Sequence, residues 1–287
     1  MTRMIDLHIH TTASDGTDTP SQVVRLALER DLAAIAITDH DTVDGLAEAE
    51  NAAEGQNLEV VRGCELSVHT DFGELHLLGL WLPYDVGPLE ACLERIRAKR
   101  GVRNERIVEK LGELGVALPY QAVLDEAQGD VVGRPHIARA LVRHGFVRDE
   151  KEAFSRYLRS GAAAYVARET LPAREGVRLM ASLGATVAVA HPLLARCSRS
   201  TLERTVTVLR EEGLDVLEAW HSEQSPADTE WLCALARRLD LGVTGGSDYH
   251  GSVKPHVRLG MGGGGLTVSE QVLEALKARR VRQGLPV

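Results

Sequence analysis

The chain has 287 residues, a formal net charge of −8, 44% hydrophobic residues and 26% charged residues. This composition is typical of a folded globular protein and excludes a disordered chain; the length suits one large domain or a barrel with an insertion. The longest apolar stretch, residues 75–82, is too short to cross a membrane, and the first residues lack the apolar segment of a signal peptide. Four scattered cysteines form no C-x-x-C motif, so the sequence predicts a cytoplasmic protein without a disulfide framework or a thiolate zinc site.

Strand-like runs alternate with helical patterns on both sides of a central segment. Strands are expected at residues 5–10, 33–38, 58–68, 75–82, 186–190, 215–220 and 241–244. Helices are expected at residues 20–30, 42–54, 172–183, 201–212, 227–239 and 269–279. Residues 71–73 favour a hairpin between the third and fourth strands. Repeated β–α units indicate an α/β fold with a parallel sheet, either open or closed.

The central segment differs from the rest of the chain in pattern and in charge. Between about residues 88 and 165 only helical patterns occur, at 89–114, 120–127, 135–144 and 150–159. Residues 95–160 hold fourteen Lys and Arg against nine Asp and Glu, a balance of +5, which leaves −13 on the rest of the chain. Such a segment is either a solvated surface or a region that faces an anion. The sequence predicts a barrel formed by residues 1–90 and 165–287, and a helical insertion, residues 91–164, over the active-site mouth.

Histidines and carboxylates lie where the expected strands end. The first strand reads Asp6-Leu7-His8-Ile9-His10, and a period of two puts Asp6, His8 and His10 on one face. Similar residues accompany the other strands: Asp15, Asp39, His40, Asp41, Glu65, His76, His191, Glu218, His221, Asp248 and His250. In a β/α barrel the strand ends meet at one mouth, where active sites lie. The pattern therefore predicts a polynuclear metal site rather than scattered structural histidines.

The types of ligand limit the metal and its surroundings. Imidazole and carboxylate groups without a thiolate suit Zn²⁺, Mn²⁺ or Fe²⁺, and they disfavour a purely carboxylate Mg²⁺ site. Bound divalent cations would also neutralise part of the net charge of −8. We expect Asp6 and Glu218 to orient ligating histidines from behind.

Other catalytic motifs are weak or absent in the sequence. Residues 260–265 match the spacing G-x-G-x-x-G, but no strand with an acidic residue about 20 positions on follows them, as a dinucleotide site requires. We interpret this segment, with the glycines at 262–265, as a loop. The sequence contains no G-x-S-x-G elbow and no P-loop.

A series of short motifs runs from residue 6 to residue 250. They are Asp6-Leu-His8-Ile-His10, Ser-Asp15-Gly, Thr-Asp-His40-Asp, Gly-Cys-Glu65, Leu-His76, Arg134-Pro-His136, His191-Pro and Gly-Ser-Asp248-Tyr-His250. In this order they resemble the PHP (polymerase and histidinol phosphatase) family. The resemblance implies a distorted (β/α)₇ TIM-like barrel with two or three divalent cations. It implies one cation at His8, His10, Glu65 and Asp248, a second at Asp15, His40 and His250, and a third at Glu65, His76 and His191.

Within this family the chain is similar to stand-alone bacterial phosphoesterases of the nucleoside 3′,5′-bisphosphate phosphatase and 5′-to-3′ exoribonuclease type, which carry a helical insertion after the fourth strand. Their Lys-Arg-x-x-Arg and Arg-Pro-His stretches match Lys99-Arg100-Gly-Val-Arg103 and Arg134-Pro135-His136, which the resemblance implies as substrate-binding residues. His136 either contacts substrate or caps a helix. The resemblance further implies that a metal-bridging hydroxide hydrolyses phosphate esters of nucleotides or short RNA 5′ ends. Mn²⁺ is then the favoured cation, ahead of Fe²⁺ or Zn²⁺, and the catalytic residues are Asp15, His40, His191 and Arg134.

Two other functions compete with this one. The first is a histidinol-phosphate phosphatase, and the second is a non-catalytic, metal-stabilised domain that binds nucleic acid. The basic insertion favours the nucleotide substrate over histidinol phosphate, and the complete ligand set argues against a non-catalytic domain. The insertion holds few aromatic residues for base stacking. The expected partner is therefore a nucleotide or short RNA, with no membrane partner and no stable binding of double-stranded DNA.

Overall fold

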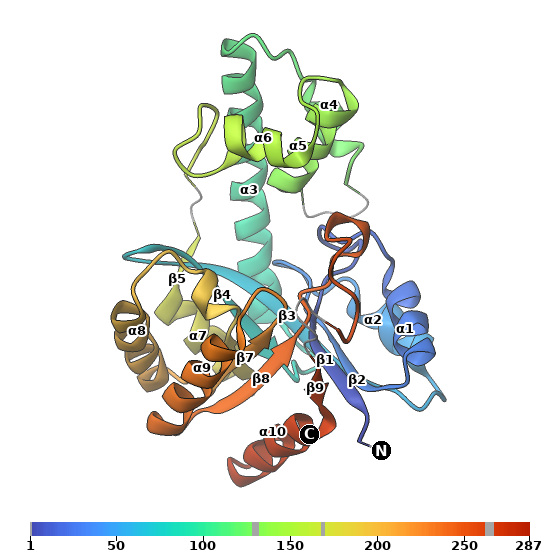
Figure 1. The fold of residues 1–287 in the computed structure, drawn as a ribbon, viewed down its shortest axis with the longest axis vertical. Helices are drawn as coiled ribbons and strands as arrows, with labels where there is room; N and C mark the ends of the chain where they lie inside the picture. Colours follow the sequence, from blue (N-terminus) through green and yellow to red (C-terminus); the bar gives the residue numbers. More distant parts are fainter. Residues whose placement is uncertain (1, 128–131, 168–169, 262–266) are drawn as a thin grey trace.

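The computed structural model describes residues 2–127, 132–167, 170–261 and 267–287. These residues form a barrel of strands and helices from which a tall helical part rises (Figure 1). The glycines at 262–265, interpreted above as a loop, lie outside the described residues. In the described part of the chain, no helix combines the length and the apolar character that crossing a membrane requires.

The strands of the described residues belong to one nine-stranded sheet. Its order is β8-β7-β6-β4-β3-β2-β1-β9, and β5 pairs with β3. The pairs β1–β2, β2–β3, β6–β7 and β7–β8 are parallel, whereas β4 runs antiparallel to both β3 and β6. The strands are β1 Met4–Ile9, β2 Leu32–Ile37, β3 Glu59–Thr70, β4 Gly73–Leu80, β5 Leu171–Pro172, β6 Thr186–Val189, β7 Val216–His221, β8 Gly242–Gly246 and β9 Val268–Ser269.

The two sides of the sheet meet at β1 and the segment that follows β8. The backbone N–H of Asp248 donates to the carbonyl of His8 at 3.0 Å, and the N–H of His10 donates to the carbonyl of Tyr249 at 2.9 Å. The nearly closed sheet confirms the α/β class and the distorted TIM-like barrel that the resemblance implies. The hairpin between β3 and β4 is also confirmed, because the two strands pair from Thr70 and Gly73 onward.

Capping side chains set where the barrel helices begin. Thr19 accepts the N–H of Gln22 in a capping box ahead of α1. The helix α2 begins at Leu46, later than the sequence pattern predicts, because Thr42 and Asp44 bond to each other in a turn. The barrel helices are α1 Pro20–Glu29, α2 Leu46–Ala53, α7 Ala173–Ser182, α8 Arg199–Glu211, α9 Pro226–Arg238 and α10 Glu270–Arg282.

The long helix α3, Gly87–Glu113, connects two hydrophobic cores. Its first half places Leu89 and Leu93 in the main core of the barrel, and its second half places Ile107 and Leu111 in a separate core above the barrel (Figure 1). The other helical elements of this upper part, in the described residues, are α4 Tyr120–Leu124, α5 Arg134–Arg143, α6 Glu150–Ala153 and the π-helical turn η1 Phe154–Leu158. The helical segment predicted between residues 88 and 165 is therefore present, with α3 as a continuous rod between barrel and upper part.

The close approach of β8 to β1 leads to a prediction about the stability of the protein. A Cβ atom at Gly246 of β8 would lie 2.4 Å from both the Cβ and the backbone N of His8 on β1. We expect Gly246→Ala to push the two strands apart and to lower the free energy of unfolding by about 1–3 kcal/mol. The measurement is the denaturant midpoint of each variant.

Gly112→Ala is the matched control for this variant. Nothing lies within 4 Å of the Cβ position at Gly112, which is near the end of α3. Alanine also has the better helix propensity, by up to about 1 kcal/mol. The control should be unchanged or more stable; equal losses in both variants would contradict the tight contact between β8 and β1.

Candidate metal centre

One end of the barrel brings all nine predicted ligands together. His8, Glu65 and His76 lie on β1, β3 and β4, and the others follow strands: His10, Asp15, His40, His191, Asp248 and His250. Their ligand-type atoms form four overlapping groups, and within each group the atoms lie within 4.8 Å of one another. The structure thus makes one continuous cluster of residues that are as far as 242 positions apart in the sequence.

Glu65 is at the centre of this cluster and is fully buried. Its Oε1 atom lies 2.9 Å from His76 Nδ1 and 2.9 Å from His191 Nε2. Its Oε2 atom lies 2.8 Å from His40 Nδ1, 3.2 Å from His10 Nε2 and 3.5 Å from His8 Nε2. One carboxylate is therefore shared by five imidazoles, as expected of a ligand that bridges cations.

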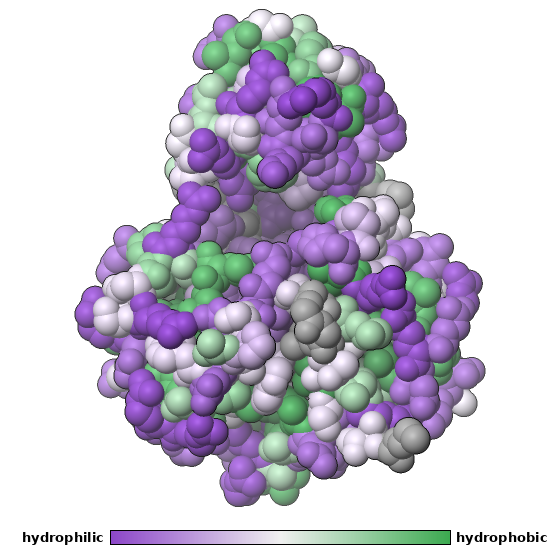
Figure 2. Space-filling model, viewed as in Figure 1, coloured by the Kyte–Doolittle hydropathy of each residue, from purple (hydrophilic) through white to green (hydrophobic). Residues whose placement is uncertain are grey.

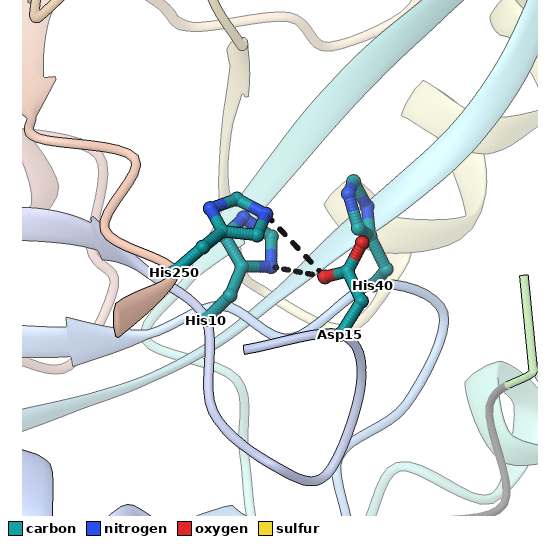
Figure 3. Close-up of side chains that lie close together, drawn as sticks. All are labelled: His10, Asp15, His40 and His250. Carbon is teal, nitrogen blue, oxygen red and sulfur yellow. Dashed lines mark ion pairs between the residues drawn. The ribbon is translucent and has the colours of Figure 1, made fainter. Parts of the chain in front are cut away.

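Asp15 forms the second focus of the cluster. Its Oδ1 atom lies 3.3 Å from His250 Nε2 and 3.9 Å from His10 Nδ1. Figure 3 shows these side chains and His40 pointing toward one another from separate loops. The close grouping includes His10 as well as the three residues that the family resemblance implies for the second cation.

The cluster fits divalent cations by its chemistry. Buried His10 Nδ1, Asp15 Oδ1 and Glu65 Oε2 have no hydrogen-bond partner within the described residues. Unsatisfied buried polar atoms are costly, and buried charges are normally paired or bind metal. Imidazole nitrogens and carboxylate oxygens together suit Mn²⁺, Fe²⁺ or Zn²⁺.

The ionisation of the metal-free cluster follows from its own charges. Burial alone would raise the pKa of Glu65, but His40 and His76 lower it well below its usual range. Burial would lower the pKa of His10 and of His76, but the neighbouring carboxylates outweigh burial and raise both pKa values to about 9. Burial dominates at His40 and lowers its pKa to about 4. At neutral pH His10 and His76 therefore carry protons that a binding cation must displace.

Asp6 and Glu218, the two residues predicted to orient ligating histidines, act in different ways. Glu218 Oε1 accepts a hydrogen bond from His8 Nδ1 at 2.9 Å, and Glu218 Oε2 accepts the backbone N–H of His191 at 2.5 Å. Glu218 thus orients the imidazole of a predicted ligand. Asp6 instead accepts hydrogen bonds from backbone groups and from the Ser247 hydroxyl, and its closest contact to His8 is the backbone N–H at 3.4 Å. Asp6 therefore holds the loop after β8 rather than an imidazole ring.

Sequence reasoning did not assign roles to Asp39 and Asp41, although it noted both beside His40. Asp39 accepts hydrogen bonds from Thr11 and Ser14 at 2.6–2.7 Å, and so it holds the loop that leads to Asp15. Asp41 is fully buried, accepts the backbone N–H of Ser67 at 2.8 Å and pairs with the guanidinium of Arg100. Their position directly after β2 is the sequence feature that could have indicated a role for them at the site.

The backbone is left-handed at two of the predicted ligands. His191 has φ 28°, and Asp248 has φ 56°. Neither is a glycine, and such conformations persist only where the surrounding structure holds them. At Asp248 the backbone bond to His8 supplies such support, and at His191 the bond to Glu218 does. Strained backbone at two cluster residues is typical of a functional site.

A cavity of about 140 Å³ opens beside the cluster, below the helical part. Figure 2 shows a hydrophilic hollow between the helical part and the barrel. Residues from both sides line the cavity: Asp15, His40, Glu74, His76, Arg100, Arg103, Gly133, Arg134, Pro135, His136 and Phe154. Five of the six predicted substrate-binding residues are therefore at the cavity. The sixth, Lys99, is exposed on α3 and is not among the described residues that line it.

The arginines of the cavity are held in place by contacts with carboxylates and a backbone carbonyl. Arg100 pairs with Asp41, and Arg103 Nε donates to the carbonyl of Val166 at 2.9 Å. Arg134 Nη2 lies 3.8 Å from Glu74 Oε2 on β4, so the pair joins the helical part to the barrel. These contacts place guanidinium groups beside Asp15, His40 and His76 in one cavity.

His136 has a capping role at the start of α5. Its Nδ1 atom accepts the backbone N–H of Gly133 at 3.0 Å. Burial lowers the pKa of His136 to about 4, so the ring is neutral at pH 7. Because Nδ1 accepts a hydrogen bond, the ring proton is on Nε2. The cap does not prevent a substrate contact, because the side chain also lines the cavity.

A cluster of histidines and carboxylates at the mouth of a β/α barrel, beside a cationic cavity, defines a metal-dependent hydrolase of anionic esters. The PHP domain family model matches residues 6–161. A 5′-3′ exoribonuclease of Escherichia coli K12 is 33% identical over 247 residues, which cover 85% of this chain and 84% of the relative. A 3′,5′-nucleoside bisphosphate phosphatase of Chromobacterium violaceum is 31% identical over 247 residues, covering 86% of this chain and 87% of the relative.

A solved structure of similar fold agrees with these matches. It is described as a metal-dependent phosphoesterase from Bifidobacterium adolescentis, and it is 32% identical, covers 96% of each chain and has a TM-score of 0.85. The chain belongs to the PHP family, and it is a metal-dependent phosphoesterase that uses divalent cations. The alternative of a non-catalytic nucleic-acid-binding domain is therefore wrong.

The raised pKa values of two cluster histidines predict that metal binding depends on pH. His10 and His76, with pKa values of about 9, are protonated at pH 7, and a ligating imidazole must be neutral. The apparent affinity for Mn²⁺ should therefore rise from pH 6 to pH 9, by up to about tenfold per pH unit for each proton displaced. Calorimetric titration in two buffers with different heats of ionisation measures the protons released; identical heats in both buffers at pH 7 would contradict this prediction.

Proposed function

We propose that this PHP phosphoesterase hydrolyses phosphate esters of nucleotides, with nucleoside 3′,5′-bisphosphates or short 5′-phosphorylated RNA as its preferred substrates. One observation carries the proposal: Arg100, Arg103 and Arg134 share a single cavity with the cluster residues His40 and His76. Such a cavity suits a substrate that presents one phosphate to the cluster and a second to the guanidinium groups, which bind phosphate oxygens in bidentate fashion. The exoribonuclease and bisphosphate phosphatase relatives agree with this substrate class.

The proposal assigns the nine clustered residues to three cations, with Mn²⁺ as the metal. The sets are His8, His10, Glu65 and Asp248; Asp15, His40 and His250, with His10 close by; and Glu65, His76 and His191. Bound divalent cations supply Lewis acidity at the phosphoryl oxygens and lower the pKa of water to the neutral range. Glu65 then belongs to two sets, which its 2.8–3.5 Å spacing from five imidazoles supports.

The side chains of the protein position the ester and offset its charge. Arg134 lies at the rim, where its guanidinium can neutralise charge that develops on the phosphoryl oxygens. The His136 ring carries its proton on Nε2 and is neutral at pH 7, so it can donate a hydrogen bond to a phosphate oxygen without adding charge. Asp15, His40 and His191 act through the cations that they hold.

A second cavity supports the nucleotide part of the proposal. It measures about 240 Å³ and shares Glu74, His76 and Arg134 with the first cavity, but its other lining residues are Leu75, His191, Leu194 and Ala195. Leu194 is 42% exposed at the end of the short helix η2, Pro192–Leu194. We assign the uncharged base of the leaving nucleotide to this more apolar cavity. The two cavities then separate the charged and uncharged ends of one substrate.

Histidinol phosphate fits the first cavity less well. Its ammonium group would meet three guanidinium groups there, whereas the carboxylate of Glu74, which also lines the cavity, lies 3.8 Å from Arg134 and 3.4 Å from His76.

We also propose that residues 91–164 act as an insertion on a barrel formed by residues 1–90 and 165–287. The separate hydrophobic core above the barrel supports this division.

The proposal predicts an order of substrates for the Mn²⁺-loaded enzyme. A second phosphate should gain charge-assisted hydrogen bonds of about 1.5–3 kcal/mol. This corresponds to roughly one to two decades in kcat/KM over a nucleoside monophosphate, with histidinol phosphate last. The measurement is phosphate release across this panel after chelation and reloading with Mn²⁺. Histidinol phosphate as the best substrate would disprove the nucleotide assignment.

The preference for two phosphates should depend on Arg134. Arg134→Gln should reduce the advantage of the bisphosphate over the monophosphate by about tenfold, since one guanidinium contact corresponds to about 1.5 kcal/mol. Arg143→Gln is the matched control, because Arg143 is on the same helix, is exposed and pairs with Glu126 away from the cavity. An unchanged preference in the Arg134 variant would show that the basic insertion is only a solvated surface.

The second cavity predicts a selective effect of Leu194→Ala. Removing an apolar contact of about 1 kcal/mol should raise KM for AMP about fivefold and leave KM for ribose 5-phosphate, which has no base, unchanged. Leu114→Ala is the control, because Leu114 is 48% exposed at the end of α3 and lines neither cavity within the described residues. Equal effects on the two substrates would place the base elsewhere.

A further inference from the structure

A seventh histidine, His221, lies beside the six histidines of the cluster but belongs to none of its metal-ligand groups. It ends β7, is 1% exposed, and its ring centroid lies 5.5 Å from that of His191 and 6.3 Å from that of His8. Its Nε2 atom lies 3.4 Å from Asp248 Oδ2. A buried imidazole this close to predicted ligands is either a further ligand or a residue that holds one of them.

The hydrogen bond at the other ring nitrogen decides between these roles. The backbone N–H of Glu223 donates to His221 Nδ1 at 3.1 Å. A backbone N–H can only donate, so Nδ1 has the lone pair and the ring proton of the neutral imidazole is on Nε2. His221 therefore has an N–H, not a lone pair, at Nε2, which lies 3.4 Å from Asp248 Oδ2 and forms no hydrogen bond within the described residues, so Asp248 is the nearby group to which this buried N–H can turn.

Two of the histidines predicted to bind a cation have the opposite arrangement. His8 Nδ1 donates to the Glu218 carboxylate at 2.9 Å, and His250 Nδ1 donates to the carbonyl of Asp248 at 2.8 Å. Each of these bonds leaves a lone pair on Nε2, directed at the cluster. The tautomer thus distinguishes His221, with its proton on Nε2, from His8 and His250, which have a lone pair on Nε2.

A second donor reaches the same oxygen of Asp248. Lys254, which follows the short helix η3 (Gly251–Val253), places its Nζ atom 2.5 Å from Asp248 Oδ2. The other carboxylate oxygen, Oδ1, faces the cluster and lies 3.1 Å from His10 Nε2 and 3.5 Å from His8 Nε2. The two oxygens of Asp248 therefore face different partners.

We propose that His221 and Lys254 are positioning residues that occupy Asp248 Oδ2 and leave Oδ1 alone to bind a cation. The inference rests on the proposed use of Asp248 as a metal ligand. The hydrogen bond from Lys254 and the nearby N–H of His221 would disfavour binding of a cation through Oδ2, so that Asp248 would hold the cation through Oδ1 alone. The left-handed backbone at Asp248 helps to hold the carboxylate in this orientation.

The test compares a variant that keeps the donor with one that removes it. His221→Gln retains an amide N–H that can reach Asp248, whereas His221→Leu has no donor. Calorimetric titration of the metal-free proteins with Mn²⁺ should show one binding step weakened about 10–100-fold in His221→Leu and close to wild type in His221→Gln. Equal affinities in wild type and His221→Leu would overturn the proposal, as would a Gln variant as weak as the Leu variant.

Substitution of Lys254 provides an independent test that does not alter the buried core. Lys254→Met should weaken the same Mn²⁺ step, and Lys277→Met should not, because Lys277 is similarly exposed and pairs with Glu59 at 2.6 Å on the outside of the barrel. Unfolding of each metal-free variant is measured in parallel. A loss of stability without any change in Mn²⁺ affinity would assign both residues a structural role only and overturn the inference.

This experiment separates the inference from the proposed function. Wild-type protein that binds Mn²⁺ but releases no phosphate from nucleotides would contradict the proposed substrate, and the ranking of Mn²⁺ affinities would still test His221 and Lys254. A nucleotide phosphatase whose Mn²⁺ affinity does not respond to these substitutions would keep its function and lose this inference.

Discussion

The burial of the Glu65 carboxylate among five histidines is the constraint on which the rest of the site depends. An isolated buried carboxylate is strongly unfavourable, and here protons or cations on the surrounding imidazoles must compensate for it. The partners of Glu65 come from β1, β4 and the segments after β1, β2 and β6, so the compensation exists only when the barrel has closed. Barrel closure and cation binding are therefore linked: a cation that binds the closed cluster stabilises the fold by mass action.

The positions of the ligands could be predicted because they follow from local periodicity. His8 and His10 share one face of a strand, and Asp248 and His250 repeat that spacing after β8. In a β/α barrel the ends of the strands lie together at one mouth. The alternation of strands and helices was therefore sufficient to predict that residues far apart in the sequence are close in space. The direction of β4 could likewise be predicted, because so short a connection to β3 permits only an antiparallel pair.

Features that depend on contacts between distant residues could not be predicted. The pair of Arg100 with Asp41 joins α3 to the end of β2, and the pair of Lys254 with Asp248 depends on a loop without periodicity. The role of His221 depends on a single backbone N–H two residues further on, which decides the tautomer. Asp6 shares a strand face with His8, yet its side chain bonds to the loop after β8. Side-chain orientation at this level follows from packing, not from spacing.

The charge of the helical part has a more specific meaning in the structure than in the sequence. A balance of +5 suggests a diffuse attraction for anions, but two of the arginines at the cavity already face carboxylates. The partner of Arg100 is the buried Asp41, so separating this pair would leave an uncompensated buried charge. Arg134 faces the partly exposed Glu74 across 3.8 Å, a contact that contributes little and is readily exchanged. Under the proposed function, Arg100 therefore anchors α3 to the barrel, whereas Arg134 can turn from Glu74 to an incoming phosphate, and discrimination between substrates depends on this exchange.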